Sequence, residues 1–502
     1  MTKDMPKDFQ KLEDFQDAVV TVMGLGRFKQ GSGIGAAKWL LRQGAQIVVT
    51  DLKSEADLKS SVDLVTEWYS KYREQYPDRT IYAPVFILGQ HREDDFTNVE
   101  LVVKNPDVPK ESDYVQLAEK NGVRVESDVS IFFHFYRHPI YGVTGTRGKS
   151  TTTVLIGEML KKVHPKTVIA GNIMHSPLEE LDWLLKEQAP VPVVLEMSSW
   201  LLDSLTHIDR GLDIAVLTNI SEDHLDRYAS FEAYIDSKKQ VFKQQTPEQK
   251  AVLNYDHTIV RKVGEGVSSK KYWFSQKPLP AGTEGGFLDT KGDLYLRISG
   301  NERRLCHVSE WPALQGEHNF QNAMAATITA SLAGVPDEAL CETLKTFQGL
   351  DGVQQTVREL SGVTYINDTK STSPDAVIAA LKRFGNEKPR GAGSGSAGKH
   401  IIIIVGGKAK GFGFEEMAEW VRKSCHHVVY LEGVATDEIE KAVGPSIPAS
   451  YASSMEGAVK AAQKIAHDGD LVLLSPGTAS FGLFKNAYDR GGQFVEAVKN
   501  LV

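Results

Sequence analysis

Apolar runs that end in glycine or polar residues recur along this chain, and they predict parallel strands that enter loops. The first run, residues 18–26, reads as a buried strand that enters a glycine turn. A helical pattern around 36–43 and a second strand at 46–50 follow, and this strand ends at Asp51. A later strand at 99–103 stops at a proline-containing turn. Together these elements predict a Rossmann-like βαβ domain that binds a nucleotide.

The same alternation continues through two further segments of the chain. A glycine-rich loop precedes strands at 193–196 and 214–219, which predicts a central, P-loop-type α/β domain. Further strands alternate with helical patterns in a third, Rossmann-like segment, at 363–367, 400–405, 427–431 and 470–474. We therefore predict an α/β protein of three domains, 1–138, 139–349 and 350–502. The Gly/Ser-rich stretch 391–398 reads as a flexible surface loop.

Composition narrows the class of protein. The 502 residues carry 57 basic and 65 acidic side chains, a net charge of −8, which argues against nucleic acid as a partner. The three cysteines are widely spaced and odd in number, so they resemble neither a disulfide framework nor a zinc site. No stretch reaches the roughly 18 apolar residues of a membrane span, and the N-terminus lacks a signal-peptide core. We expect a soluble, cytoplasmic protein without membrane insertion.

The strongest candidate for chemistry is the segment Gly145-Thr-Arg-Gly-Lys-Ser-Thr151, which follows an apolar lead-in. Glycines let backbone N–H groups turn inward, Lys149 can reach phosphate oxygens, and Ser150 can place a hydroxyl on Mg²⁺ at a helix N-terminus. A standard P-loop needs a glycine at 143, where this chain has valine, so the spacing is shorter than usual. This segment predicts ATP as a ligand.

Other polar groups stand directly after predicted strands or at a predicted helix start. Glu196 ends an apolar run, and its carboxylate suits Mg²⁺. Taken alone, Glu196 fits the role of a helix-capping acid equally well. His224 lies among acids and an arginine after the strand at 214–219, and we favour a functional role for it. Asn319 and Asn322, at i and i+3, can face one ligand. Composition alone predicts that Lys238 lies on the solvent-exposed face of an amphipathic helix.

Taken in order, six segments resemble the Mur ligase family over nearly the whole chain. They are Gly145-Thr-Arg-Gly-Lys-Ser-Thr151, Leu195-Glu-Met-Ser-Ser199, Asn219-Ile-Ser-Glu-Asp-His-Leu-Asp-Arg-Tyr228, Gly316-Glu-His-Asn319, Asn367-Asp-Thr-Lys370, and Leu474-Ser-Pro476 through Arg490-Gly491. The resemblance implies that the first domain holds a UDP moiety, the second binds ATP, and the third brings in an amino acid. It implies an amide ligase for UDP-N-acetylmuramoyl-L-alanine and glutamate, in its D form, and we expect a monomer.

The resemblance also assigns roles to individual residues. Lys149, Glu196, His224 and Lys238 would be catalytic. Two Mg²⁺ ions would be held by Ser150, Glu196, His224 and Lys238, the last as a carbamate, because an ammonium cannot ligate a cation. The ATP contacts would be Gly145, Thr146, Arg147, Gly148, Lys149, Ser150, Thr151, Asn319, Asn322, Asp368 and Lys370. The substrate contacts would be Gly26, Asp51, Lys53, Asn105, Asn172 and Ser198 for the UDP substrate, and Thr372, Lys410 and Ser480 for glutamate.

The implied reaction passes through an acyl phosphate. The alanine carboxylate attacks the γ-phosphate of ATP, Mg²⁺ and Lys149 offset the repulsion between these anions, and the glutamate amine then displaces phosphate. Closure of the third domain would keep water from the acyl phosphate.

Three departures from the family pattern keep alternatives open. Gly352 and Val353 stand where the family has a His-Arg pair, and Arg147 in the phosphate loop is one replacement for the missing cation. Ala487, with Tyr488 beside it, stands at the family's aromatic contact to glutamate, which leaves the amino acid and its handedness open. The first glycine turn is also enlarged. A ligase for another amino acid, a non-catalytic UDP-sugar-binding relative and a nicotinamide-dependent oxidoreductase are the competing hypotheses.

Overall fold

The computed structural model describes residues 9–26, 31–173, 175–205, 207–223, 227–385, 400–408, 413–480 and 483–501. The Gly/Ser-rich stretch 391–398 lies outside these residues. Contacts divide the chain into two compact units, one comprising Met1–Trp311 and Asn319–Thr346, the other Pro312–His318 and Phe347–Val502. The first unit contains two sheets and the second contains one. The fold is therefore mixed α/β, as the alternating pattern predicts.

The first sheet is parallel throughout, with strand order β3-β2-β1-β4-β5. Its strands are β1 (Val19–Met23), β2 (Gln46–Asp51), β3 (Val85–Leu88), β4 (Leu101–Lys104) and β5 (Arg124–Glu126). Its helices are η1 (Leu12–Phe15), α1 (Ser32–Arg42), α2 (Glu55–Gln75), α3 (Asp94–Thr97), α4 (Asp113–Lys120) and α5 (Asp128–Phe135). Because β1 pairs with β2 on one side and β4 on the other, the strand order reverses at β1. Ligands of such sheets bind outside the carboxyl ends of the strands at this reversal.

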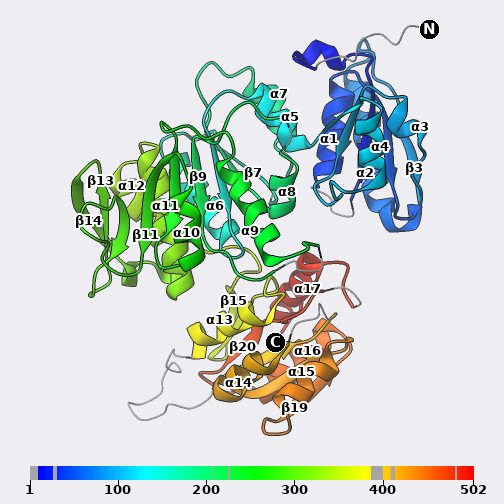
Figure 1. Cartoon of the computed structure of the whole chain (residues 1–502). Coiled ribbons are helices and arrows are strands. Elements are labelled where there is room, and N and C mark those ends of the chain that lie inside the picture. The colour runs from blue at the N-terminus through cyan, green and yellow to red at the C-terminus, as the bar shows by residue number, and fades with distance from the viewer. Residues whose placement is uncertain are drawn as a thin grey trace. The chain divides into compact units, whose positions relative to one another are not determined.

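The second sheet has the order β14-β13-β12-β11-β10-β9-β6-β8-β7, with β13 antiparallel to both of its neighbours (Figure 1). Its strands are β6 (Ile140–Thr144), β7 (Val168–Gly171), β8 (Val193–Glu196), β9 (Ile214–Leu217), β10 (Lys250–Asn254), β11 (Lys270–Ser275), β12 (Gly285–Leu288), β13 (Asp293–Ile298) and β14 (Asn301–His307). Its helices are α6 (Lys149–Lys161), α7 (Leu178–Leu184), α8 (Ser199–Asp203), α9 (Phe231–Lys239), η2 (Gln240–Phe242), α10 (Thr258–Glu265), η3 (Val308–Glu310), α11 (Glu317–Leu332) and α12 (Asp337–Thr346). The turn η4 (Pro312–Leu314) belongs to the second unit. The pairing puts β6, which leads into the glycine-rich loop, between β8 and β9.

One hydrophobic cluster includes residues from both sheets of the first unit, such as Val20 and Val193, together with Trp39 of α1 and Leu181 of α7. Polar contacts reinforce it, since the Trp39 Nε1–H donates to Asp182 Oδ1 at 3.1 Å and Arg42 pairs with Asp182 at 2.6 Å. This shared packing between α1 and α7 explains why the two sheets form one unit.

The second unit, yellow to red in Figure 1, contains a six-stranded sheet of order β15-β16-β20-β17-β18-β19, in which only β15 is antiparallel to its neighbour. Its strands are β15 (Gln355–Leu360), β16 (Val363–Asn367), β17 (Ile401–Val405), β18 (Cys425–Leu431), β19 (Ala449–Ala452) and β20 (Leu471–Leu474). Its helices are α13 (Pro374–Gly385), α14 (Glu415–Ser424), α15 (Thr436–Val443), α16 (Met455–Ile465) and α17 (Ala487–Lys499). Alternate residues of β17 belong to different hydrophobic clusters, Ile401 and Ile403 to one, Ile402 and Ile404 to the other. Both faces of this sheet are therefore covered, which accounts for the uninterrupted apolar run.

The strands expected from apolar runs are present with small shifts of their ends. The run at 99–103 begins pairing at Leu101 and extends to Lys104, and the helix expected around 36–43 begins earlier, at Ser32. The amphipathic helix expected around Lys238 begins at Phe231, ends at Lys239 and continues as the 3-10 turn η2. The sequence interpretation missed the antiparallel strands at 293–307 and the long helix α2. Among the helices that the structure describes, none combines the length and apolar character needed to span a membrane.

Candidate active site

The glycine-rich loop joins β6 to α6, as its sequence predicts. Gly145 and Gly148 have positive φ angles of +151° and +81°. A Cβ atom at Gly145 would lie 1.9 Å from the Thr218 hydroxyl oxygen, and one at Gly148 would lie 2.1 Å from Asn322 Oδ1. Glycine is therefore required here both by the backbone angles and by the close approach of two neighbouring side chains.

Asn219, directly after β9, fixes the middle of this loop. Its backbone oxygen accepts from the Thr146 N–H at 2.9 Å, and its side-chain oxygen accepts from the Arg147 N–H at 2.8 Å. The Asn219 Nδ2 donates to the Arg147 carbonyl at 3.1 Å. Asn219 lies in a motif that resembles the family, but sequence reasoning assigned it no role. The available signal in the sequence was its position at the end of a predicted strand.

Two lysine side chains converge on one carbonyl of the loop. Lys149 Nζ donates to the Gly145 oxygen at 3.0 Å, and Lys238 Nζ, from α9, donates to the same atom at 2.9 Å. Lys149 also donates to the Thr146 oxygen at 3.0 Å. Lys238 is 1% exposed and its Nζ lies 4.7 Å from the centre of the Tyr234 ring. The interpretation of Lys238 as a solvated side chain is therefore wrong.

The surroundings disfavour the charged form of both lysines. Burial lowers the pKa of Lys149, while Glu196 acts in the opposite direction. Burial, and secondly the positive charge of Lys149, lower the pKa of Lys238 well below its ordinary value. A lysine with a lowered pKa presents a larger fraction of neutral, nucleophilic amine than an exposed one.

Glu196 lies at the end of β8 and faces the start of α6. One of its oxygens accepts from the Ser150 hydroxyl at 2.6 Å, and the other accepts from Asn172 Nδ2 at 2.8 Å. The carboxylate is buried, with the residue 1% exposed. Ser198 caps α8, its hydroxyl accepting from the Leu201 N–H at 3.2 Å. A buried carboxylate beside a serine hydroxyl is a hard oxygen donor set of the kind that Mg²⁺ prefers.

Asn319 and Asn322 lie in the first turns of α11 and are both buried. The Asn322 Nδ2 donates to Asn319 Oδ1 at 3.4 Å, so the two amides lie side by side on α11. Asn322 also lies against Gly148, which places these amides beside the phosphate loop.

The four residues expected near uridine diphosphate meet at the carboxyl edge of the first sheet. Asp51 Oδ2 accepts from the Leu25 and Gly26 N–H groups, at 3.0 and 3.3 Å, and its Oδ1 accepts from the Lys53 N–H at 2.9 Å. Asn105 Nδ2 donates to the Gly24 oxygen at 3.2 Å. These contacts hold the glycine turn after β1, so Asp51 has at least a structural role there.

A buried cation on β4 was missed. Lys104 Nζ donates to the Ser204 hydroxyl at 2.7 Å and to the Val108 oxygen at 3.1 Å. Burial lowers the pKa of Lys104 to about 8, with Arg227 acting in the same direction. Arg227 lies 4.4 Å from the centre of the Trp200 ring. The only sequence signal was a lysine at the end of an apolar strand.

In the second unit, Asp368 organises the loop after β16. Its oxygens accept from the hydroxyls of Ser371 and Ser475 and from the Gln354 N–H. Burial raises the pKa of Asp368 to about 6. Because its oxygens are engaged within the loop, the carboxylate at least orders the segment that carries Lys370 and Thr372.

Buried Arg490 links this loop to the one that carries Ser480. Its Nη2 donates to the Thr369 oxygen at 2.8 Å and its Nη1 to the Thr478 oxygen at 3.2 Å. One guanidinium group thus holds Thr369 and Thr478, which lie close in the chain to the predicted glutamate contacts Thr372 and Ser480. Sequence reasoning quoted Arg490 as part of a motif without giving it a role.

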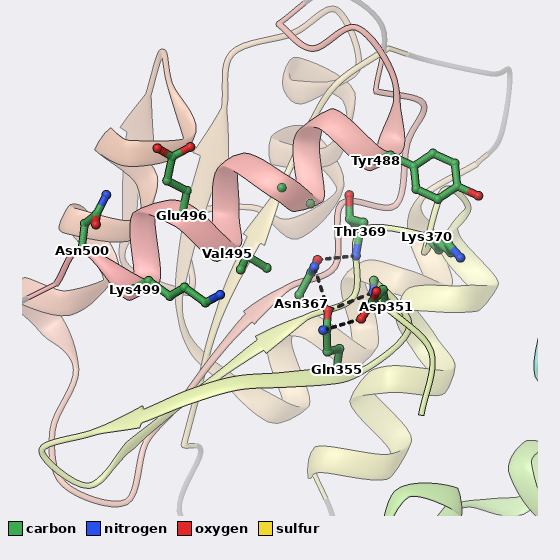
Figure 2. Close-up of a pocket in the computed structure, with 13 residues that line it drawn as sticks. Asp351, Gln355, Asn367, Thr369, Lys370, Tyr488, Val495, Glu496, Lys499 and Asn500 are labelled. Atoms are coloured by element: carbon green, nitrogen blue, oxygen red, sulfur yellow. Dashed lines mark hydrogen bonds between the residues drawn. The ribbon is translucent and has the colours of Figure 1, made fainter. Parts of the chain in front are cut away.

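A cavity of about 640 Å³ lies in the second unit, and Lys370 is among its lining residues (Figure 2). Gln355 Oε1 accepts from the Gly352 N–H at 3.0 Å and from Asn367 Nδ2 at 3.2 Å. Gly352 has φ +73°, and a Cβ atom there would lie 2.8 Å from Thr369 Cγ2. A side chain at this position would therefore strain the turn that this chain forms and press against Thr369.

His224 and Lys410 lie outside the described residues. Within the described ranges, no group of three or more His, Cys, Asp or Glu side chains is placed to hold a metal ion. The donors that the structure does bring together are the Ser150 hydroxyl and Glu196, and the Lys238 amine contacts the Gly145 carbonyl of the same loop.

Two family models match this chain. The Mur ligase middle domain matches residues 143–330, and the Mur ligase, glutamate ligase domain matches residues 354–477. The UDP-N-acetylmuramoylalanine–D-glutamate ligase of Roseiflexus sp. (strain RS-1) is 39% identical over 487 residues, which are 95% of this chain and 98% of the relative. The ligase of the same name from Trichlorobacter lovleyi is 33% identical over 96% of this chain and 98% of its own length.

Solved structures show the same fold. The crystal structure of UDP-N-acetylmuramate-alanine ligase MurC from Thermotoga maritima aligns with a TM-score of 0.57 at 17% identity, covering 96% of this chain and 99% of that chain.

Proposed function

This chain belongs to the Mur ligase family, and from that premise we propose that it joins D-glutamate to UDP-N-acetylmuramoyl-L-alanine with conversion of ATP to ADP and phosphate. The reaction serves the synthesis of peptidoglycan precursors. The supporting observation is that ligases of this name match the chain over nearly its full length. The structure adds a phosphate loop with two lysines on one carbonyl and a buried serine–carboxylate pair beside it.

We assign ATP to the phosphate loop. Its backbone N–H groups and the N-terminus of α6 suit phosphate oxygens. Lys149 would exchange its two carbonyl acceptors for phosphate oxygens, and Asn319 and Asn322 would contact the nucleoside. Lys370 and Asp368 would contribute from the second unit. Arg147 and Arg383 are two cations that could replace the arginine absent at Val353. Arg383 donates to Gln354 at 2.8 Å, beside the Asp368 loop.

We propose that Ser150 and Glu196 hold one Mg²⁺ ion and that Glu196, His224 and Lys238 contribute to a second. Bound Mg²⁺ would supply Lewis-acid stabilisation of the charge that develops on the phosphoryl oxygens. The serine hydroxyl and the carboxylate fit this ion, whereas the Lys238 ammonium does not. The lysine fits only after its neutral amine adds to CO₂, releases a proton and becomes a carbamate. Its burial against Lys149 supports this conversion, because a carbamate would pair with that cation.

The substrate carboxylate would attack the γ-phosphorus, and the leaving ADP oxygen would depart in line. Lys149 and the loop N–H groups would stabilise the charge that moves onto the phosphoryl oxygens. The glutamate amine then adds to the acyl carbonyl, loses a proton and expels phosphate. Thr372, Lys410 and Ser480 would position this glutamate, and Gly26, Asp51, Lys53, Asn105, Asn172 and Ser198 would position the UDP substrate.

We retain the boundaries 1–138, 139–349 and 350–502 for a UDP-substrate domain, a P-loop-type ATP domain and an amino-acid domain, the outer two Rossmann-like. We also propose that the enzyme acts in the cytoplasm, where its nucleotide substrates are made. We propose that it acts there as a monomer.

Phosphate release from ATP tests this function. With UDP-N-acetylmuramoyl-L-alanine present, D-glutamate should stimulate release and formation of the amide product, whereas L-glutamate or no amino acid should not. Stimulation by a different amino acid would show that the protein is a Mur-family ligase for that amino acid. Tight binding of the UDP substrate without turnover under any of these conditions would instead support a non-catalytic binding protein.

A further inference from the structure

Two cysteines that lie far apart in the sequence meet in the first unit. Cys306 is on β14 and Cys341 is on α12. Ion pairs anchor α12 on both sides of Cys341: Asp337 with Arg303 of β14 at 2.6 Å, and Lys345 with Glu310 of the adjoining turn η3 at 2.6 Å. The three helix positions are spaced by four residues, so they lie on one face of α12. The two ion pairs therefore fix Cys341 opposite Cys306.

The two thiols are in direct contact. A side-chain hydrogen bond between them lowers the pKa of Cys341 and raises that of Cys306. Lys345, one turn further along α12, also lowers the pKa of Cys341, whereas Asp337 and Glu310 raise it. Cys306 is 3% exposed, while Cys341 is partly exposed. A partly exposed cysteine with a lowered pKa is thus backed by a buried second thiol, an arrangement typical of reactive dithiols.

We propose that Cys306 and Cys341 are a redox-active pair that forms an intramolecular disulfide on exposure to a low-molecular-weight disulfide such as glutathione disulfide. The Cys341 thiolate attacks one sulfur of the oxidant, forming a mixed disulfide and expelling one glutathione thiolate. Cys306 then loses its proton and attacks the Cys341 sulfur, expelling the second glutathione thiolate. Two protein thiols are oxidised, and one glutathione disulfide is reduced to two glutathione molecules.

This site is separate from the proposed ligase chemistry and does not depend on it. The disulfide would fix α12 covalently to β14. Glu342, next to Cys341, pairs with Lys162 at 3.0 Å, directly after α6, the helix that begins at the phosphate loop. The chain enters the second unit immediately after α12 ends at Thr346. Oxidation would therefore stiffen the element that links the phosphate-loop helix to the second unit.

Cys425 is the matched reference. It begins β18 in the second unit and is fully buried, so the full-length protein carries one cysteine that should stay reduced. Full-length, folded protein is incubated with glutathione disulfide, quenched with acid, and unfolded for thiol titration. Three thiols should fall to one in the wild type, and two should fall to none in Cys425→Ser.

Peptide mass measurement identifies the pair. No lysine or arginine lies between Leu305 and Lys345, so trypsin leaves both cysteines in one peptide. Disulfide formation should lower the mass of this peptide by about 2 Da, reversibly with dithiothreitol. In Cys341→Ser the peptide should stay unchanged, and in Cys306→Ser it should gain one glutathione.

Persistence of three free thiols in the folded wild type, with oxidation only after unfolding, would overturn the proposal. So would a stable glutathione adduct on wild-type Cys341 that never resolves. Cys341 is partly exposed, so Cys341→Ser keeps the test decisive even if the buried Cys306→Ser variant fails to fold.

Discussion

Lys149 and Lys238 donate hydrogen bonds to the same atom, the carbonyl oxygen of Gly145, at 3.0 and 2.9 Å. Two ammonium groups so close repel one another, and Lys149 is the second largest cause of the lowered pKa of Lys238. Conversion of Lys238 to a carbamate would replace this repulsion with attraction. The pair therefore connects the phosphate loop with the proposed metal site.

Lys238→Ala should lower ligase activity by roughly 100-fold or more, because a metal-binding carbamate would be lost from a site where charge develops. A short added carboxylate such as acetate should restore part of the activity by occupying the vacated space. The rate of phosphate release measures both effects. Lys239→Ala, which removes a neighbouring exposed ammonium paired with Asp236, is the control and should keep full activity. Full activity in Lys238→Ala would refute the carbamate.

Glu196→Gln should reduce affinity for Mg²⁺ by roughly 100-fold, since an amide oxygen is a weaker ligand than a carboxylate. The readout is the Mg²⁺ concentration that gives half-maximal activity at saturating ATP. Glu158→Gln, which removes a carboxylate from the exposed face of α6, is the matched control and should leave that concentration unchanged. An equal response of both variants would show that Glu196 acts only by supporting the fold.

Gly148→Ala should weaken ATP binding by more than tenfold. Its φ of +81° strains any L side chain by about 1 kcal/mol, and the new Cβ would lie 2.1 Å from Asn322 Oδ1. Gly334→Ala separates these effects, because Gly334 has φ +93° but no atom within 4 Å of the added Cβ. Gly334→Ala should lose a small amount of stability from its backbone angle alone, Gly148→Ala should lose more because Asn322 must shift, and only Gly148→Ala should bind ATP weakly in calorimetry. Equal ATP affinity in the two variants would contradict a phosphate site at this loop.

Lys104 should make the first unit more stable as pH rises from about 8 to 10.5. The folded pKa is lowered, so over this range the unfolded chain binds a proton that the folded chain does not, and the free energy of unfolding increases with pH. The rise is of the order of 3 kcal/mol, at 1.36 kcal/mol per pKa unit. Lys104→Met should lack this rise, whereas Lys120→Met, at an exposed lysine of α4, should follow the wild type. Denaturant unfolding at each pH measures the difference, and parallel curves for all three proteins would contradict it.

The site could be predicted only in part because its components differ in how locally they are specified. The phosphate loop is one continuous segment that contains the glycines, the hydroxyls and Lys149. The spacing of these residues in the sequence is enough to predict phosphate binding. Lys238 is 89 positions away from Lys149 on a helix whose composition predicts exposure. Its burial depends on α9 packing over the loop, and only resemblance to a family singled it out. Asn219 had no local signal beyond its place after a strand.

The sequence by itself determined where strands and glycine turns form, because apolar runs and positive-φ requirements act over a few residues. It also determined which turns carry phosphate-binding and carboxylate groups. Only the tertiary structure decided that β6 lies between β8 and β9, which brings Glu196 to Ser150 and Asn219 to Arg147. Only the packing of α12 on β14 decided that Cys306 meets Cys341. Strand order and helix packing depend on the fit of surfaces distant in the chain, and no local pattern of residues specifies that fit.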